Sequence, residues 1–308
     1  MILGCGEALI DMIPAPTARG AEGFVPHCGG AVYNTAVALG RLGAQTGMLT
    51  GLSTDMFGQQ LAQGLKASHV DVSHLIYSTR PTTLAFVRLV DGHATYEFYD
   101  ENSAGRMIKP SDMPILSPEI TALYFGGISL ACEPGADAYA TLLERNAEGR
   151  AVMLDPNIRP SFIRDIDRYR TRLNKMVGLA DIVKVSDEDL NWITPEPLSL
   201  DDKVARLQEL GPSVVILTRG GDGATGYFGS GETVQVAAQS AEIVDTVGAG
   251  DTFNAGVLAK LSELGVLHPD GLATIDAATL TRALEHGARV AAVTVSRAGA
   301  NPPWAGEL

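Results

Sequence analysis

Short apolar segments alternate with longer amphipathic segments along most of this 308-residue chain. Because parallel strands need a crossover helix between them, this alternation predicts a doubly wound α/β fold with helices on both faces of a sheet. Several apolar segments end in a polar residue, where ligands bind in such folds. The expected strands are 2–10, 46–52, 121–126, 151–155, 181–185 and 213–218, and the expected helices are 31–42, 57–67, 135–148, 162–178, 200–210, 251–264 and 276–295.

Two hairpins interrupt this alternation. Residues 82–90 and 94–99 alternate apolar and polar side chains, and Asp91-Gly92 between them favours a tight turn. Because one face of such a pair is wet, we expect it to project from the main sheet as a small β appendage. Residues 223–236 are predicted to form a second hairpin.

Charge and apolar content exclude several classes of protein. The net charge of −13 argues against nucleic acid and anionic membrane surfaces as partners. No apolar run reaches the roughly 18 residues of a membrane span, and Glu7 and Asp11 interrupt the apolar N-terminal segment, which lacks the basic residues of a signal peptide. We therefore expect a cytoplasmic protein. The cysteines Cys5, Cys28 and Cys132 make no CxxC pair, which argues against a local zinc site.

The 34 glycines are clustered, and the most informative cluster lies within residues 245–256. Gly248, Ala249 and Gly250 precede a helix-compatible run. A glycine turn at a helix N-terminus directs N–H groups and the positive end of the helix dipole toward an anion. Asp251 in the first turn either complements that dipole or accepts the proton of an alcohol that attacks a phosphoryl group.

A second cluster, Gly29-Gly30, leads into the expected helix 31–42. Two glycines let a backbone approach a ligand closely. Asn34, one turn inside the helix, either binds hydroxyl groups or faces solvent. Asp11 follows an apolar run, where an unpaired carboxylate is costly. We interpret Asp11 as a ligand for polyol hydroxyls, and a turn or cap role is the alternative.

The third cluster, residues 218–223, directly follows an expected strand and fits either a loop over a nucleotide or a hairpin turn. Motifs of other enzyme classes are not matched. Residues 4–9 lack the third glycine of a dinucleotide fingerprint, Tyr227 stands where a P-loop requires lysine, and the chain contains no G-x-S-x-G.

Together with the Asp155-Pro156-Asn157-Ile158-Arg159 segment, these clusters resemble the ribokinase-like (PfkB) carbohydrate kinases in order and spacing over nearly the whole chain. Val32 departs from the family, which usually has a small residue or proline there. Within the family, residues 4–11 (GCGEALID) and 299–303 (GANPP) are most similar to those of bacterial fructokinases.

The resemblance implies a three-layer α/β/α fold with a mostly parallel central sheet and a small β-lid that closes over the sugar and excludes water. Tyr96, Phe98 and Tyr99 would either pack within the lid or face the sugar and a second subunit, giving a homodimer through the lid. We expect a large domain of residues 1–10, 27–80 and 102–308 and a discontinuous lid of residues 11–26 and 81–101.

The resemblance also implies an activity, which is the Mg²⁺-dependent transfer of the γ-phosphate of ATP to a primary hydroxyl of a free sugar. Fructose is the expected acceptor. The alternatives are 2-keto-3-deoxygluconate, ribose or a nucleoside as acceptor and, from another class, a non-catalytic sugar or nucleotide sensor. An acid sugar would require an additional cation beside the lid, for which Arg88 and Arg106 are candidates.

Roles for individual residues follow from the same resemblance. Asp251 would be the general base, and the N–H groups of Gly248, Ala249 and Gly250 would form the anion hole. Arg159 would neutralise phosphate or form a structural salt bridge. The substrate ligands would be Asp11, Gly29, Gly30, Asn34, Phe98, Asn157, Arg159 and Asp251, and the nucleotide ligands Lys184, Ser186, Thr218, Gly220, Gly221, Gly223 and Gly250.

Two metal sites are implied as well. Residues 186–189 (SDED) stand where the family often has Asn-x-x-Glu, and Asp189 would organise Mg²⁺ through water. Lys184, just before them, either reaches a phosphate or is an ordinary surface lysine. A monovalent cation such as K⁺ would be held by the backbone carbonyl groups of Asp245, Val247, Thr294, Arg297 and Gly299.

Overall fold

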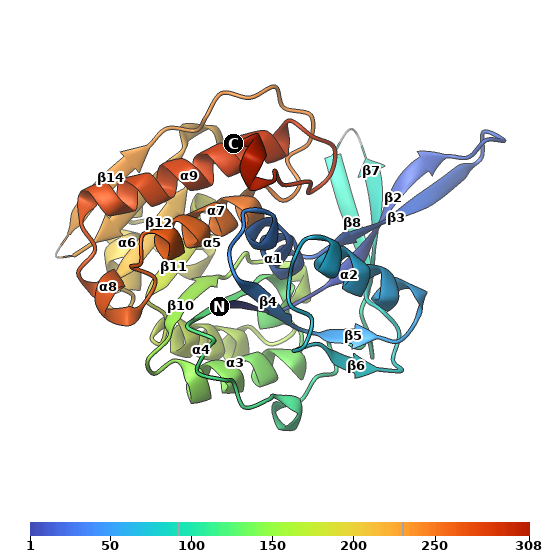
Figure 1. Ribbon diagram of the computed structural model, residues 1–308, viewed down its shortest axis with the longest axis horizontal. Helices are drawn as coiled ribbons and strands as arrows, with labels where there is room; N and C mark the ends of the chain where they lie inside the picture. Colours follow the sequence, from blue (N-terminus) through green and yellow to red (C-terminus); the bar gives the residue numbers. More distant parts are fainter. Residues whose placement is uncertain (91–92, 230) are drawn as a thin grey trace.

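The computed structural model describes residues 1–90, 93–229 and 231–308, and an eight-stranded sheet with the order β14-β13-β12-β11-β10-β9-β1-β4 forms its centre (Figure 1). Neighbouring strands from β12 to β4 are parallel, whereas β13 is antiparallel to both of its neighbours. The expected mostly parallel sheet is confirmed. The strands are β1 (Ile2–Cys5), β4 (Thr46–Leu49), β9 (Ala122–Gly126), β10 (Ala151–Asp155), β11 (Ile182–Ser186), β12 (Val214–Thr218), β13 (Ala224–Phe228) and β14 (Glu232–Val236).

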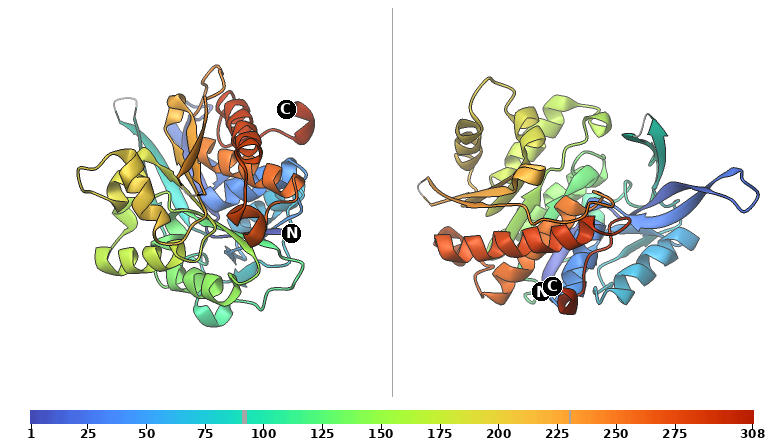
Figure 2. Two further views of the ribbon diagram at one scale, coloured as in Figure 1. Left: turned by 90° about the vertical axis from the view of Figure 1, so that its left-hand side faces the viewer. Right: turned by 90° about the horizontal axis from the view of Figure 1, so that it is seen from above.

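Helices cover both faces of the sheet, which gives the three layers that the resemblance implies (Figure 2). One face packs against α1, α2, α7, α8 and α9, and the other against α3 to α6. Across the described ranges, no helix is both long and apolar enough to cross a membrane. The helices are α1 (Ala31–Arg41), α2 (Met56–Ala67), α3 (Gly135–Asn146), α4 (Ile166–Val177), α5 (Asp187–Ile193), α6 (Leu200–Gln208), α7 (Ala249–Glu263), α8 (Pro269–Ala273) and α9 (Ala277–Val295).

The uninterrupted apolar character of the central strands follows from these two covered faces. Successive side chains of a strand point to opposite faces of a sheet. Tyr124 of β9 therefore packs in the core with α1 and α7, while its neighbours Leu123 and Phe125 pack in the core with α3 and α4. Both sides of each strand must be apolar, so the pattern of polar alternation is absent.

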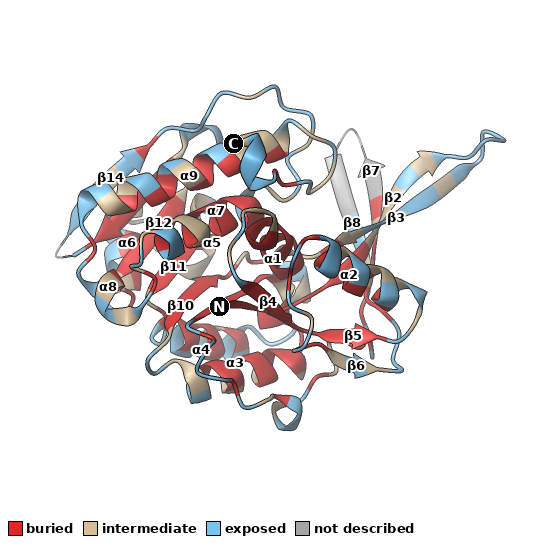
Figure 3. Cartoon of the chain, in the orientation of Figure 1, coloured by how far each residue is buried: buried red, intermediate tan, exposed pale blue. Residues whose placement is uncertain are grey.

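A four-stranded sheet, β3-β2-β7-β8, projects from the body (Figure 1). Its strands are β2 (Leu9–Pro16), β3 (Glu22–Gly29), β7 (Leu84–Val90) and β8 (His93–Tyr99). The outer part of the β2–β3 hairpin is exposed, in contrast to the buried central strands (Figure 3). The predicted strand pair β7–β8 is confirmed, and its predicted turn Asp91-Gly92 lies outside the described residues. The division into a large domain and a lid stays a prediction.

Two predicted strands are wrong in extent because tertiary contacts break them. The expected strand 2–10 is divided between β1 and β2, since the chain bends at Gly6 and the N–H of Ile10 then bonds to the carbonyl of Thr83, directly before β7. The expected strand 46–52 is divided between β4 and β5 (Gly51–Ser53), which pairs with β6 (Ile76–Ser78) in a separate sheet.

Two helix starts also differ from the prediction. Helix α4 begins at Ile166, because the side chain of Asp165 accepts the N–H of Arg168 at 3.0 Å. Helix α7 begins at Ala249, two residues earlier than expected, directly after Gly248. The sequence interpretation also missed β6, α5 and α8 altogether.

Helices α7 and α9 approach closely at Gly256 and Gly287. A Cβ added at Gly256 would lie 2.7 Å from the Cα of Gly287. Although alanine is ordinarily the better helix former, we expect Gly256→Ala to lower the free energy of unfolding by about 1–3 kcal/mol through overpacking. Urea denaturation measures this, with Gly306→Ala as the control, because a Cβ at Gly306 meets no atom within 4 Å. A G256A variant as stable as the wild type would contradict this packing.

Candidate active site

A cleft of about 620 Å³ lies at the carboxyl edge of the central sheet, where the N-termini of α1 and α7 meet. Its walls include two loops, the β1–β2 connection and the turn after β9, together with strand β8 of the projecting sheet. Of the predicted site residues, the walls contain Asp11, Gly30, Asn34, Phe98, Asn157, Arg159, Lys184, Val247, Gly248, Ala249, Gly250 and Asp251.

The turn before α7 presents backbone N–H groups to this cleft. Gly248 has a φ of 77°, a left-handed conformation that glycine adopts without strain, and no side chain caps the helix. Among the described residues no acceptor is found for the N–H groups of Gly248 and Gly250, while that of Ala249 makes a long bond of 3.3 Å to Thr246. With the helix dipole behind them, these donors favour a bound anion.

Asp251 is buried in the first turn of α7. Its Oδ2 accepts a hydrogen bond from Asn34 Nδ2 at 2.9 Å, and Thr35 Oγ1 donates to its backbone carbonyl at 3.1 Å. Burial raises the pKa of the Asp251 carboxyl to about 7, against the opposing effect of the Asn34 bond. A carboxyl with such a pKa exchanges protons near neutral pH, as a general base must.

A further carboxylate, that of Asp11 on β2, lines the cleft beside the projecting sheet. Asp11 lies there with Gly29 beside its carboxylate, and burial raises its pKa to about 6. Phe98 packs edge-on against Phe162, with the ring centroids 4.5 Å apart. The predicted hydroxyl ligands Asp11, Gly30 and Asn34 therefore all line the cleft, whereas Gly29 lies beside the Asp11 carboxylate and is not among the wall residues.

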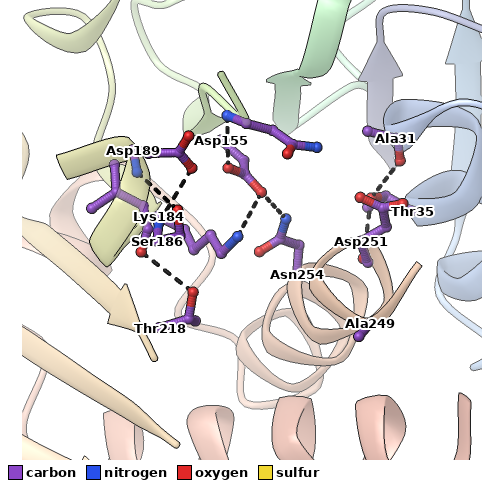
Figure 4. A network of polar contacts seen from close by, with 12 residues as sticks. Ala31, Thr35, Asp155, Lys184, Ser186, Asp189, Thr218, Ala249, Asp251 and Asn254 are labelled. Carbon is purple, nitrogen blue, oxygen red and sulfur yellow. Dashed lines mark hydrogen bonds and ion pairs between the residues drawn. The ribbon is translucent and has the colours of Figure 1, made fainter. Parts of the chain in front are cut away.

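A buried ion pair stands beside the α7 turn (Figure 4). Lys184 Nζ donates to Asp155 Oδ2 at 3.0 Å, and Asn254 Nδ2 donates to the same oxygen at 2.7 Å. Asn254 Nδ2 also donates to the Tyr124 hydroxyl at 3.1 Å. A Cβ at Gly250 would lie 3.4 Å from Lys184 Nζ, so the ammonium group adjoins the anion-binding turn. Lys184 is thus no ordinary surface lysine.

The Asp155–Arg159 segment turns beside this pair. Asn157 has a φ of 41°, and its N–H donates to Asp155 Oδ1 at 3.2 Å. The Arg159 guanidinium donates to the carbonyl groups of Asn157 and Ile158 and, in the part of the chain that the structure describes, has no carboxylate partner. A structural salt bridge is therefore not found for Arg159, which faces the cleft.

The SDED segment has a local structural role. The Ser186 hydroxyl caps α5 by accepting the N–H of Asp189 at 3.0 Å, while Asp189 Oδ2 accepts the N–H of Ser186 at 3.4 Å. Asp189 Oδ1 accepts the N–H of Ile158 at 2.8 Å. Both carboxylate oxygens of Asp189 thus accept backbone N–H groups. Burial raises the pKa of Asp189. Its role in organising Mg²⁺ through water stays a prediction.

The predicted nucleotide loop lies farther along the same sheet edge. Thr218 ends β12 directly beside Ser186 of β11. Gly220 and Gly221 form a 3-10 turn, followed by Gly223, and these residues lie outside the cleft walls. Of the predicted nucleotide ligands, Lys184 and Gly250 therefore line the cleft. The 218–223 loop follows the neighbouring strand β12 and is not part of the cleft walls.

The segments predicted to hold a monovalent cation are brought together. Asp245 accepts the N–H of Val247 at 3.0 Å and that of Gly299 at 2.9 Å. The carbonyl of Thr294 accepts the N–H of Arg297 at 3.0 Å, and the Arg297 side chain pairs with Glu307. Within the described ranges, no cluster of three His, Cys, Asp or Glu side chains could hold a metal ion.

The sequence interpretation missed Glu7 as a site residue. It lines the cleft, is only 9% exposed, and accepts the N–H groups of Ala31 and Ser129. The signal was available, because Glu7, like Asp11, is a carboxylate within an otherwise apolar segment.

The Lys184–Asp155 pair generates a prediction about stability. Lys184→Met leaves the Asp155 carboxylate buried without its cation, so we expect the free energy of unfolding to fall by about 3–5 kcal/mol. The double variant K184M/D155N removes both charges and should recover most of that loss. Urea denaturation of the single and double variants measures both values. A double variant that is no more stable than K184M alone would show that the pair is not the source of the effect.

The chain is similar to known proteins in both sequence and fold. The chain is 48% identical to a fructokinase of Rhizobium leguminosarum bv. trifolii over 276 residues, which is 90% of this chain and 84% of that protein. A fructokinase with bound ATP from Xylella fastidiosa superposes with a TM-score of 0.89 at 27% identity, covering 97% of this chain and 93% of that one. A fructokinase double mutant from Vibrio cholerae O395, in fructose, ADP and potassium ion bound form, has a TM-score of 0.84 at 26% identity and covers the same shares. Residues 2–305 match the model of the pfkB family of carbohydrate kinases, and the chain belongs to that family.

Proposed function

We propose that this chain is an ATP-dependent fructokinase that phosphorylates a primary hydroxyl of the free sugar. The observation that carries the proposal is the buried Asp251 carboxyl, with a pKa of about 7, in the first turn of the helix whose N-terminus faces the cleft. The relative of 48% identity, a fructokinase, supports fructose as the acceptor.

In the proposed reaction the sugar hydroxyl oxygen attacks the γ-phosphorus in line. The new oxygen–phosphorus bond forms as the bond between the γ-phosphorus and the β–γ bridging oxygen breaks, and ADP leaves with that electron pair. The hydroxyl proton passes to the Asp251 carboxylate. The N–H groups of Gly248 and Gly250 and the Lys184 ammonium stabilise the charge on the transferring group.

The charges of the cleft favour a neutral acceptor. The walls contain the cations Arg159 and Lys184, which we assign to phosphate. A sugar acid would therefore meet the remaining charges, the carboxylates of Glu7, Asp11 and Asp251, and their repulsion. Arg106, proposed above as a cation for an acid sugar, is buried in an ion pair of 2.6 Å with Asp100 and lies outside the walls. The side chain of Arg88 lies outside the described residues. Fructose is therefore favoured over 2-keto-3-deoxygluconate.

Mg²⁺ and K⁺ belong to the proposal. Mg²⁺ is commonly held by one or two carboxylates together with substrate phosphates, which fits a chain whose described part has no preformed metal cluster. When bound, Mg²⁺ would neutralise phosphate charge, with Asp189 organising its water.

The adjoining segments 245–247 and 294–299 would hold K⁺ through backbone carbonyl groups, and the potassium-bound fructokinase of Vibrio cholerae supports this. The 218–223 loop would line the ATP site.

We also propose a cytoplasmic homodimer without nucleic acid or membrane partners, in keeping with the net charge of −13. Phe24 and Tyr99 of the projecting sheet are large and exposed, and both pack against Phe86 on the face opposite to Phe98 and the cleft. They would form the contact between two lids.

A coupled ADP-release assay tests the substrate. We expect fructose to give the highest kcat/KM among fructose, tagatose, ribose, adenosine and 2-keto-3-deoxygluconate, because the cleft walls suit a neutral polyol. Turnover confined to the acid sugar would overturn the substrate class. An absence of turnover with every acceptor would overturn the kinase proposal and favour a sensor.

Asp251 as the base predicts a pH profile. The wild-type kcat should rise as pH increases through about 7, where Asp251 loses its proton. Asp251→Asn should lower kcat by about 10²–10⁴-fold and spare most of the fructose affinity. A D251N variant with near-normal kcat would contradict the assignment.

The same shift predicts a stability effect that needs no turnover. Because the folded-state pKa of Asp251 is raised from 3.8 to about 7, its stabilising contribution is complete below pH 3.8 and is lost as pH rises through 7. D251N has no such titrating group at this position. The Tm of D251N minus the Tm of the wild type should therefore increase from pH 5 to pH 8. A constant difference in Tm would contradict the raised pKa.

A further inference from the structure

Helix α1 begins without a cap of its own. Its N-cap residue is Gly30, no side-chain hydrogen bond caps it, and its first turn contains no acidic residue. The first N–H groups of a helix need acceptors, and an uncapped start frays or shifts. Since Asn34 lies on this first turn, the position of the helix start bears directly on the site.

Glu7 supplies the missing cap from a distant part of the chain. Its Oε1 accepts the N–H of Ala31 at 3.1 Å, and its backbone carbonyl accepts the N–H of Tyr33 at 3.2 Å. Two of the first three N–H groups of α1 thus bond to one residue, 24 positions before the helix starts. A carboxylate at this place also complements the helix dipole.

The second carboxylate oxygen of Glu7 fixes another wall of the cleft. Oε2 accepts the N–H of Ser129 at 3.2 Å, just beyond the turn at Gly127 that follows β9. A Cβ at Gly127 would collide with Glu7 Oε1, so the turn leaves room only for the carboxylate. Glu7 therefore joins the β1–β2 connection, the start of α1 and the turn after β9, which all line the cleft.

Helix α1 connects Glu7 to Asp251, the proposed base. Asn34 Nδ2 donates to the Asp251 carboxylate at 2.9 Å, and Thr35 Oγ1 donates to the backbone carbonyl of the same residue at 3.1 Å. A shift of the first turn of α1 would move both donors together. The contact between Asn34 and Asp251 thus depends on where Glu7 holds the helix.

We propose that Glu7 is a positioning residue for phosphoryl transfer, whose buried carboxylate anchors the start of α1 and thereby sets the Asn34–Asp251 contact. This inference rests on the proposed function, in which Asp251 is the base.

The charged and titratable groups around Asp251 make the inference measurable by pH. Asn34 on α1 and Lys184 on β11 lower the pKa of Asp251, while Asp155 on β10 and Glu7 raise it. Loss of the Glu7 charge alone would lower this pKa, and loss of the Asn34 bond would raise it. The Asn34 bond is a direct contact of 2.9 Å, whereas in the described part of the chain no hydrogen bond or ion pair joins Glu7 to Asp251. Displacement of α1 should therefore raise the pKa.

The test is Glu7→Gln, whose amide offers only one acceptor where two N–H groups point. We expect kcat with fructose to fall by roughly 10–100-fold, as for a small misplacement of a reacting group. The acid limb of the kcat profile should move to higher pH, with little change in KM for ATP. An unchanged kcat and acid limb, whatever the change in Tm, would overturn the proposal, and so would a limb moved to lower pH.

Asp181→Asn is the matched control. Asp181 Oδ2 also accepts a backbone N–H, that of Val152 at 2.8 Å, and burial also raises its pKa, but it lies at the amino ends of β10 and β11, away from the cleft. D181N should lower Tm without moving the acid limb. Should E7Q not fold, Glu7→Asp retracts the carboxylate by one methylene and is judged by the same two readouts.

A double-mutant cycle with Asn34→Ala tests whether Glu7 acts through Asn34. If it does, E7Q should lower kcat much less in the N34A background than in the wild type. Fully additive losses would contradict a route through Asn34. Wild-type turnover separates the two levels of inference, because an inactive wild type defeats the proposed function, whereas an active wild type with a normal E7Q defeats only the role of Glu7.

Discussion

The burial of one carboxylate, that of Asp251, at the N-terminus of α7 is the constraint around which the site is arranged. A buried carboxylate is costly unless donors and positive potential surround it. Here the helix start, Asn34 and the nearby Lys184 compensate part of that cost, and the remainder is expressed as a pKa of about 7. The positive potential for phosphate is therefore local, which explains how a chain with a net charge of −13 can belong to a kinase family.

Much of the fold could be predicted from local pattern, because strands covered on both faces must be apolar throughout and their crossovers must be helical. Prediction failed where a distant contact decides the local structure. The expected strand 2–10 breaks where Glu7 bonds to Ala31 and Ser129 and Ile10 bonds to Thr83, and no window of sequence contains those partners. The start of α4 is different, since Asp165 is a cap that the sequence displays.

The candidate site shows the same division. Gly30, Asn34 and Asp251 could be selected from the sequence because each lies at a helix start marked by glycine. The contacts among Asp155, Lys184 and Asn254 could not, because they join residues 29 and 99 positions apart that only the sheet order brings together. Ser186 and Asp189 form a capping box, and their spacing in the sequence is sufficient to predict it. The family resemblance instead directs attention to a metal-binding element at these positions.

The account depends most on the protonation state of Asp251 in the folded protein. Carbon-13 NMR of aspartate carboxyl groups, with D251N used to assign the signal, measures this directly across pH. The account predicts a carboxyl group that titrates near 7 in the wild type and is absent from the D251N spectrum. An Asp251 carboxyl that titrates near the ordinary value of 3.8 would contradict it.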